Sequence, residues 1–353
     1  MHFIILFLIS FVLSLILTPI VRKAALKLGA IDKTEMRKVH TKRIIVRLGG
    51  VAIFLSFYLT LLLFRLFQPQ AFTNDILFIK GIFISSLLIL GLGIYDDLRG
   101  ADAKLKFSVQ IIAALIILHY GIKINLFSNP FRPEQTINIG FWGIPLTIFW
   151  LIFITNSINL LDGLDGLAAG VSCIILITMF FIASWQGDSL IMALTIALAG
   201  ATVGFLRYNF NPAKIFMGDA GSLFLGFVLA VLSVKGSHKS ATTVALLIPV
   251  ITMGLPILDT LLAIARRFSS GKNIFRADNE HIHHALIRFG LSQKKAVLVL
   301  YGFSILLGTA AFALAIIKNE HVAIILTLII VVFFVVFKYL KPIREQTKKF
   351  TLK

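Results

Sequence analysis

The chain has 353 residues, of which 58% are hydrophobic and only 14% are charged, and its mean hydropathy is +0.94. Soluble domains are closer to half apolar and a quarter charged, so this composition excludes an ordinary soluble protein and indicates a polytopic membrane protein. Lys and Arg number 34 against 16 Asp and Glu, which gives a formal net charge of +18. In a membrane protein this excess indicates basic cytoplasmic loops and contact with anionic lipids, and we expect no nucleic-acid partner.

Apolar stretches long enough to cross roughly 30 Å of hydrocarbon recur along the whole chain. They predict an all-α fold of about eleven transmembrane helices, in one membrane-embedded domain that covers residues 1–353. The first stretch is too long for a signal-peptide core and should remain as the first span. We expect spans at 3–21, 49–68, 76–95, 107–122, 144–160, 167–184, 190–207, 222–236, 242–265, 296–317 and 321–340.

The loop charges predict the sides of the membrane. Loops after the odd-numbered spans, together with the C-terminal tail, hold 27 basic residues, whereas the other side holds 7. Basic residues favour cytoplasmic loops, so the N-terminus is expected outside and the C-terminus in the cytoplasm. The cytoplasmic loops would lie near 22–48, 95–107, 156–170, 207–222 and 266–295, and most of the acidic residues fall there as well.

The first cytoplasmic loop contains DKTEMRKVHTKRIIVRLGG. Most of its charge serves topology, but Lys42 or His40 is a candidate for contact with an anionic substrate. The pair Gly49 and Gly50 would let the second span begin close against a neighbouring helix.

The next polar segment is GIYDDLRGADAKLKFSVQ, in which Asp96 and Asp97 end one span and Lys104 and Lys106 open the next. A lone pair of acids here is compatible with a simple polar turn. Ionisable groups at a membrane are, however, functional by default. Adjacent carboxylates also suit Mg²⁺ or a shared proton, because like charges so close are costly to ionise together.

The segment NSINLLDGLDGLAAG follows a strongly apolar run. Asn156, Asn159 and Asp162 are spaced to share one face of a helix, and Asp165 would continue it if the helix persisted. The glycines between them favour a break at which backbone can approach a ligand. An ordinary polar helix end is the alternative.

In NFNPAKIFMGDAGSLFLGF, Asp219 stands between glycines just before an expected helix. This pattern fits either a phosphate or metal site or an ordinary helix cap by Asp219 or Ser222. No lysine occupies a P-loop position. Asp259, within the ninth expected span, is interpreted as a supporting residue that pairs with Arg266 or lines a polar cleft.

The last cytoplasmic loop is RRFSSGKNIFRADNEHIHHALIRFG. A helix there would bring His281, His284 and Arg288 to one side. Zinc binding by His281 and His283 is disfavoured because cysteine ligands are absent nearby, and phosphate binding by Arg and His is the better interpretation. Together, carboxylates, amides and cations at one membrane face suit phosphoryl transfer.

These segments resemble the polyprenyl-phosphate N-acetylhexosamine-1-phosphate transferases of glycosyltransferase family 4. The resemblance runs collinearly from about residue 32 to 290 and rests on DDLRGADAKLKFSVQ, NSINLLDGLDGLAAG, FMGDAGSLFLG, PILDTLLAIARR and DNEHIHHALIRFG. It implies that N-acetylglucosamine 1-phosphate passes from UDP-N-acetylglucosamine to undecaprenyl phosphate with release of UMP. The HIHH segment resembles the N-acetylglucosamine branch, while another UDP-N-acetylhexosamine stays open as the donor.

The resemblance also implies roles, a cofactor and a location. The cofactor would be Mg²⁺, with Mn²⁺ as a possible substitute, and the enzyme would lie in the bacterial plasma membrane with its active site facing the cytoplasm. The family pattern has prolines where this chain has Thr34 and Val46, which puts only the shape of the first loop in doubt. The implied assignment is as follows: catalytic Asp96, Asp97 and Lys106; metal-binding Asp219 and Asp97; substrate-binding Lys42, Asn156, Asn159, Asp162, Asp165, Arg266, Arg267, His281, His283, His284 and Arg288.

Two rival functions fit the sequence less well. A secondary transporter would bind ions near the bilayer midplane between repeats, but the acids cluster at one face and no internal repeat is evident. A CDP-alcohol phosphotransferase is excluded by the spacing of the acids. The downstream glycan, a possible homodimer, and the choice between direct attack and an aspartyl-phosphate intermediate stay open.

Overall fold

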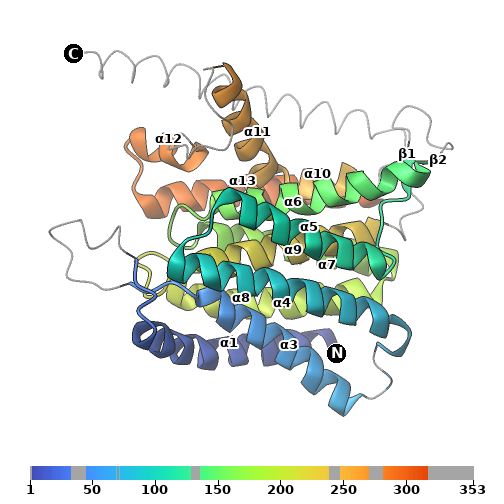
Figure 1. Ribbon diagram of the computed structural model, residues 1–353, viewed down its shortest axis with the longest axis horizontal. Helices are drawn as coiled ribbons and strands as arrows, with labels where there is room; N and C mark the ends of the chain where they lie inside the picture. The colour runs from blue at the N-terminus through green and yellow to red at the C-terminus, as the bar shows by residue number, and fades with distance from the viewer. Residues whose placement is uncertain are drawn as a thin grey trace.

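The computed structural model describes residues 2–32, 45–68, 70, 72–128, 136–237, 247–269 and 281–316, and it is a bundle of long, roughly antiparallel helices (Figure 1). The elements are α1 His2–Lys27, α3 Gly49–Phe67, η1 Thr73–Asp75, α4 Ile76–Arg99, α5 Ala103–His119, β1 Leu126–Ser128, β2 Thr136–Asn138, η2 Gly140–Trp142, α6 Gly143–Leu161, α7 Leu167–Gln186, α8 Ser189–Asn209, α9 Gly218–Ser237, α10 Leu247–Thr252, α11 Gly254–Ser269, α12 Ile282–Arg288 and α13 Gln293–Ile316.

The helical, membrane-spanning character that the apolar stretches predict is confirmed. Eight helices within the described residues are long and apolar enough to cross a bilayer, namely α1, α3, α4, α6, α7, α8, α9 and α13. The 17-residue α5 lies where a further span is expected. The expected span 321–340 lies outside the described residues, so the total of eleven and the sidedness of the termini stay predictions.

The expected ninth span, 242–265, is wrong as a single helix over the part that the structure describes. It is divided into α10 and α11, which meet at Met253. Pro256 explains the division, because a proline has no amide hydrogen to donate and its ring crowds the carbonyl four residues earlier, at Thr252. α11 then leaves the bundle at an angle (Figure 1).

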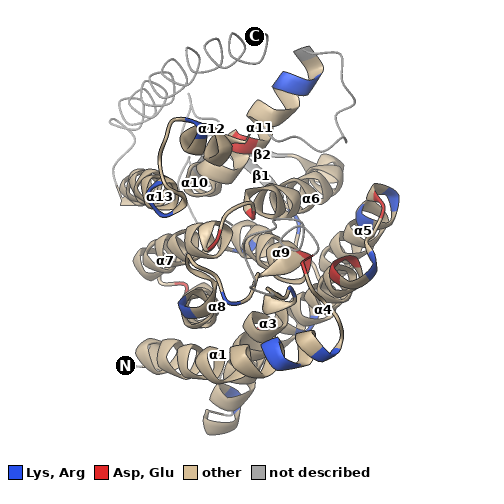
Figure 2. Ribbon diagram, turned by 90° about the vertical axis from the view of Figure 1, so that its left-hand side faces the viewer, with Lys and Arg blue, Asp and Glu red and all other residues tan. Residues whose placement is uncertain are grey.

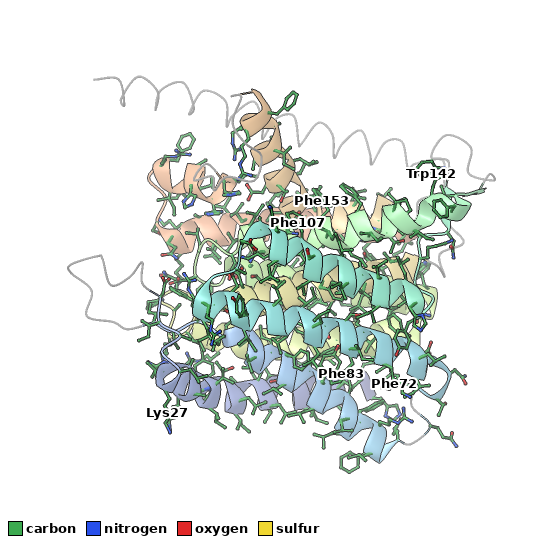
Figure 3. The ribbon with its side chains drawn as sticks, viewed as in Figure 1. Lys27, Phe72, Phe83, Phe107, Trp142 and Phe153 are labelled. Carbon is green, nitrogen blue, oxygen red and sulfur yellow. The ribbon has the colours of Figure 1, made fainter. Side chains whose placement is uncertain are left out.

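The connection between α5 and α6 also departs from an all-helical chain. It contains the short antiparallel hairpin of β1 and β2, in which Phe127 pairs with Ile137. The hairpin lies at the end of the bundle opposite Lys27, and the exposed Trp142 follows close to it (Figure 3). An aromatic residue at that position fits the interface between membrane and water.

α9 lies in the middle of the bundle and is surrounded by α3, α4, α6 and α7 (Figure 2). Its first turn approaches α3 and α4 very closely. A Cβ atom added to Gly50 would lie 2.1 Å from the Gly221 Cα atom, and one added to Gly93 would lie 2.4 Å from the Ala220 Cα atom. Because the glycines at 50 and 93 have no side chains, the start of α9 packs closely between α3 and α4. This packing fixes the position of Asp219.

Large apolar side chains cover the outside of the bundle (Figure 3). On α1, the side chains at a helical spacing of four residues are about half exposed, as expected for a surface in contact with lipid. These residues are Ile4, Leu8, Val12, Ile16 and Ile20.

Candidate active site

The polar segments that the sequence singles out converge at one end of the bundle, the left-hand end in Figure 1, onto which Figure 2 looks. The C-terminal ends of α4, α6 and α8 meet the N-terminal ends of α5, α7 and α9 there. Hydrogen bonds between the segments show that this is a connected site rather than a set of separate turns, as the following contacts establish.

Lys106 is the centre of the cluster. Its Nζ atom donates hydrogen bonds to Asp96 Oδ2 at 2.7 Å and to Asp219 Oδ2 at 2.6 Å. Asp102 accepts a hydrogen bond from the Leu105 amide at 2.9 Å and so caps the start of α5, which sets Lys106 in the first turn. The lysine therefore joins the end of α4 to the start of α9 through two ion pairs.

Asp97 caps the N-terminus of α9 from another helix. Its two oxygens accept hydrogen bonds from the amides of Asp219 and Ala220, each at 3.0 Å. These amides are among those that a helix cannot satisfy by itself, and a negative charge near them also suits the helix dipole. The Asp97 carboxylate lies so close to Gly218 that a Cβ atom there would sit 2.4 Å from Oδ2, and Gly218 has a φ of +71°. Glycine at 218 is therefore required.

The α6 side of the site is arranged by amides. Asn156 Nδ2 donates to Gln110 Oε1 at 2.7 Å, and Asn159 Nδ2 donates to Ser222 Oγ at 2.8 Å. Asn156, Asn159 and the residue that ends the helix, Asp162, follow one face, as their spacing predicts. α6 is thus tied to α5 through Asn156 and to α9 through Asn159.

Asp162 lies just beyond α6, and within the described residues no hydrogen bond reaches its carboxylate. Burial, together with the negative charges of Asp219 and Asp97, raises the pKa of Asp162 to about 8. A carboxylate without a donor beside two other carboxylates favours either a proton or a cation.

Asp165 does not continue this face. The backbone turns between Asp162 and Asp165, and Gly166 has a φ of +79°. Asp165 Oδ2 accepts hydrogen bonds from Asn211 Nδ2 and from the Ala213 amide, both at 3.0 Å. Asp165 therefore holds the connection between α8 and α9 against the start of α7.

The HIHH segment is anchored by Asp259 of α11. Asp259 Oδ2 lies 2.9 Å from His281 Nδ1, and Asp259 Oδ1 accepts a hydrogen bond from the Ile282 amide at 2.8 Å. Both side chains are buried. His281 precedes the first turn of α12 in an extended conformation, so only His284 and Arg288 share a face of that helix.

His283 connects the HIHH segment to the loop after α6. It is 1% exposed, and neither ring nitrogen has a hydrogen-bond partner in the described part of the chain. A Cβ atom added to Gly163 would lie 2.3 Å from His283 Nε2, so the ring rests directly on that loop. Burial, together with the charge of the neighbouring His284, lowers the pKa of His283 to about 4. The imidazole is therefore neutral at pH 7.

The remaining predicted residues lie in α11, in α12 or outside the described residues. Arg266 and Arg267 occupy the last turn of α11, and Arg288 is exposed at the end of α12. The ring of His284 is centred 4.2 Å from that of His283. Lys42 lies outside the described residues.

Several residues of the site have roles that the sequence did not reveal. Asn209 accepts from the Gly166 amide at 3.1 Å and donates to the Ile215 carbonyl at 3.0 Å, which ties two loops together. Arg47, from the segment before Gly49, pairs with Asp32 at 3.1 Å. The asparagines of NFNP and the arginine two residues before a double glycine were visible signals, but no local pattern identified Gly166 as a partner of Asn209 or Asp32 as the partner of Arg47.

The Asp and Asn side chains of the site suit a hard cation, because carboxylate and amide oxygens are the ligands that Mg²⁺ prefers. Across the described ranges, however, no three His, Cys, Asp or Glu side chains are arranged to hold a metal ion as they stand. Lys106 supplies the positive charge between Asp96 and Asp219. The residues present fit Mg²⁺ in type, and its binding would require the lysine and the carboxylates to adjust.

Comparison with known proteins identifies the relatives of this chain. A family model described as "Glycosyl transferase family 4" matches residues 79–237. A Bacillus subtilis protein named probable undecaprenyl-phosphate N-acetylglucosaminyl 1-phosphate transferase is 41% identical over 350 residues, 98% of this chain and 94% of the relative. A Mycobacterium tuberculosis decaprenyl-phosphate N-acetylglucosaminephosphotransferase is 36% identical over 84% of this chain and 77% of its own. A Staphylococcus aureus phospho-N-acetylmuramoyl-pentapeptide-transferase is 34% identical over 85% and 94%.

Proposed function

The chain belongs to glycosyl transferase family 4, and from this premise we propose that it transfers N-acetylglucosamine 1-phosphate from UDP-N-acetylglucosamine to undecaprenyl phosphate. The products are undecaprenyl-diphospho-N-acetylglucosamine and UMP. The observation that carries the proposal is the full-length similarity to a relative of that name, over a chain whose polar motifs meet in one cluster. The location is a bacterial plasma membrane, with this end of the bundle toward the cytoplasm.

The reaction needs an attacking oxygen, a leaving group and control of charge. A phosphate oxygen of the lipid attacks the phosphorus that carries the sugar, the bond to the UMP oxygen breaks, and UMP leaves with that oxygen. Asp96 is proposed as the base that takes a proton from the lipid phosphate. Lys106, held between Asp96 and Asp219, offsets the negative charge that the phosphates bring together.

Asp219 is proposed as the main ligand of Mg²⁺, which when bound would polarise the phosphoryl oxygens and stabilise the charge on UMP. Asp97 is proposed as a second ligand. Its oxygens already accept two backbone hydrogen bonds, but each carboxylate oxygen has another lone pair. Asp97 would therefore help to hold the cation while it also fixes the start of α9.

The nucleotide is proposed to lie over the loop after α6. Asn156, Asn159 and Asp162 would face the uridine diphosphate, and Asp165 would maintain the loop through its contacts with Asn211 and Ala213. Four groups are proposed to complete the donor site, and their physical role is recognition of phosphate and sugar oxygens. They are Lys42, Arg266 with Arg267, the histidines His281, His283 and His284, and Arg288.

The test uses purified protein in detergent with undecaprenyl phosphate and Mg²⁺, and it follows UMP release. UDP-N-acetylglucosamine, UDP-N-acetylgalactosamine and UDP-N-acetylmuramoyl-pentapeptide are compared, each with and without EDTA. Metal-dependent UMP from the first donor alone is expected. Release from another donor would retain the chemistry and change the sugar, and no release from any donor would overturn the function.

The metal assignment is tested with Asp219→Ala, using Asp75→Asn as the control. Asp75 lies at the opposite end of the bundle, beside Lys235 at 4.0 Å. We expect Asp219→Ala to lose at least about 100-fold in kcat with its thermal unfolding retained, while Asp75→Asn keeps its activity. Unchanged activity of Asp219→Ala would contradict the assignment.

A further inference from the structure

The segment before α3 is held in the site by backbone hydrogen bonds to the segment before α9. The Phe216 amide donates to the Val46 carbonyl at 2.9 Å, and the amides of Gly49 and Gly50 donate to the carbonyls of Phe216 and Met217, each at 3.0 Å. Residues 46–50 therefore run along residues 216–217, immediately before Asp219. These hydrogen bonds fix the backbone from which the side chains of residues 46–50 extend.

Leu48 shows that this backbone is constrained. It has a φ of +80° and a ψ of +13°, in the left-handed region, although it carries a branched side chain. Such conformations are unfavourable for residues other than glycine, and they persist where the surrounding structure imposes them. Here the Arg47 amide donates to the Ala30 carbonyl at 2.9 Å, and the Gly49 amide is held by Phe216. The strained residue directly follows Arg47.

Arg47 itself is held by one carboxylate and lies near two others. Its Nη2 atom lies 3.1 Å from Asp32 Oδ1, and the arginine side chain is 39% exposed whereas that of Asp32 is 10% exposed. The positive charge of Arg47 also attracts the carboxylates of Asp97 and Asp162, which belong to different sides of the site. Arg47 thus lies close enough to the end of α4 and to the loop after α6 for its charge to act on both, and part of its side chain is exposed.

The charges of the site favour a cation at this position. Asp96, Asp97, Asp162 and Asp219 bring four carboxyl groups together, and Lys106 is committed to two of them. A nucleoside diphosphate and a lipid phosphate would add further negative charge. A guanidinium has five donors in a planar fork that matches two phosphoryl oxygens, and a single carboxylate does not use all of them.

We propose that Arg47 is a phosphate-binding residue of the active site, positioned by its ion pair with Asp32 and by the constrained backbone at Leu48. The inference rests on the proposed function and deepens it. The ligand is a phosphoryl group, supplied either by the nucleotide sugar or by the polyprenyl phosphate. Arg47 binds it with the donors that Asp32 leaves unused, and Asp32 prevents the guanidinium from collapsing onto Asp97 or Asp162.

The test compares Arg47→Gln and Arg47→Lys with Arg207→Gln, which removes an exposed arginine at the same end of the bundle, in the last turn of α8. We measure kcat and KM for both substrates by UMP release. Binding of UDP-N-acetylglucosamine in the absence of lipid is measured by calorimetry. Arg47→Gln is expected to lose about 100-fold in kcat/KM, and Arg47→Lys should recover part of it because the charge stays but the fork is lost.

The two sources of phosphate give different results. If Arg47 binds the nucleotide, the Kd of UDP-N-acetylglucosamine rises about tenfold or more in the lipid-free protein. If it binds the lipid phosphate, that Kd is unchanged and the KM for undecaprenyl phosphate rises. Values for Arg47→Gln within about threefold of those for Arg207→Gln, for both substrates, would overturn the proposal.

A charge-swapped variant, Asp32→Arg with Arg47→Asp, separates phosphate binding from a structural ion pair. If the ion pair between Asp32 and Arg47 only stabilises the fold, the charge-swapped variant regains activity, and the proposal is wrong. If Arg47 binds phosphate, the swap stays inactive with thermal unfolding close to that of the wild type. Should Arg47→Gln fail to fold, Arg47→Lys and the swap still decide. Absence of UMP from the wild type would overturn the proposed function instead.

Discussion

Lys106 and Asp219 are 113 residues apart in the sequence, yet the Lys106 Nζ atom lies 2.6 Å from Asp219 Oδ2. The same ammonium lies 2.7 Å from Asp96 Oδ2, so one lysine forms ion pairs with two carboxylates contributed by different helices. Each side chain is partly shielded from solvent, with exposed fractions of 24%, 14% and 24% for Lys106, Asp96 and Asp219. At this burial a charge pair is stronger than on an open surface.

Replacing Lys106 should therefore be costly to the reaction. Lys106→Gln leaves Asp96 and Asp219 without their shared cation and removes a positive charge from the phosphate site. We expect kcat to fall about 100-fold or more, measured as UMP release. Lys104→Gln is the matched control, because Lys104 is exposed on the same helical turn and should retain activity within about twofold. Equal losses in the two variants would contradict a special role for Lys106.

The sequence predicted the helices well where the signal is local. Apolar runs place most of the spans, because each run is long enough to cross a bilayer by itself. The start of α9 was expected at 222 but lies at Gly218, because Asp97 from α4 caps its first amides. The expected face of α6 was correct through Asp162, whereas Asp165 turns toward Asn211 instead.

Long-range contacts decide what the sequence left open. Asp259 was expected near Arg266 or in a cleft, and its observed partners are His281 and the Ile282 amide. The sequence did not indicate a role for Arg47, because the position of its backbone depends on residues 216–217, about 170 positions later in the chain. The roles of the candidate residues in the reaction stay predictions until variants are measured.

The Asp162 carboxyl, which accepts no hydrogen bond from the described residues, should lower the free energy of unfolding as pH rises above about 4. Its pKa of about 8 is well above the ordinary value of 3.8. The unfolded chain therefore loses its proton near pH 4, whereas the folded protein retains it up to about pH 8. Between these values the contribution of Asp162 to the free energy of unfolding falls as pH rises, by up to about 4 kcal/mol at pH 7.

Asp162→Asn tests this directly by thermal unfolding in EDTA at pH 5, 7 and 8. We expect the variant to unfold at a higher temperature than the wild type at pH 7 and 8, with a smaller difference at pH 5. Its activity should fall, because the variant lacks the carboxyl group that is proposed to face the uridine diphosphate. A variant no more stable than the wild type at pH 8 would show that Asp162 is not destabilising.

Gly50 should tolerate no larger residue. A Cβ atom there would lie 2.1 Å from both Cα and N of Gly221, and backbone atoms cannot move aside as a flexible side chain can. Gly50→Ala should therefore separate α3 from α9, lower the free energy of unfolding by about 3 kcal/mol, and displace Asp219. Gly91→Ala is the control, because an added Cβ atom meets nothing within 4 Å in the middle of α4. That change should be neutral or stabilise the helix by about 0.5–1 kcal/mol, and thermal unfolding with UMP release measures both variants.

Asp259 and His281 form a buried hydrogen-bonded pair, with Asp259 Oδ2 2.9 Å from His281 Nδ1. Their side chains are 2% and 6% exposed, and Asp259 also accepts a hydrogen bond from the Ile282 amide, so one carboxylate orients the ring and fixes the start of α12. Asp259→Asn can still accept from that amide but loses the charge opposite the imidazole. We expect it to fold and to lose about 10-fold to 100-fold in kcat/KM for UDP-N-acetylglucosamine. Asp259→Leu leaves two buried polar groups unpaired and should lower the free energy of unfolding by about 2–4 kcal/mol.

The matched control for Asp259 is Thr260→Val. Thr260 is also buried in α11, and among the described residues its hydroxyl has no hydrogen-bond partner. Removing that hydroxyl relieves a buried polar group without breaking a contact, so the variant should be neutral or slightly more stable, with unchanged kinetics. If Asp259→Asn behaved like Thr260→Val in both unfolding and kcat/KM, the pair with His281 would have no part in donor recognition. A loss confined to the KM for undecaprenyl phosphate would instead assign α12 to the lipid side of the site.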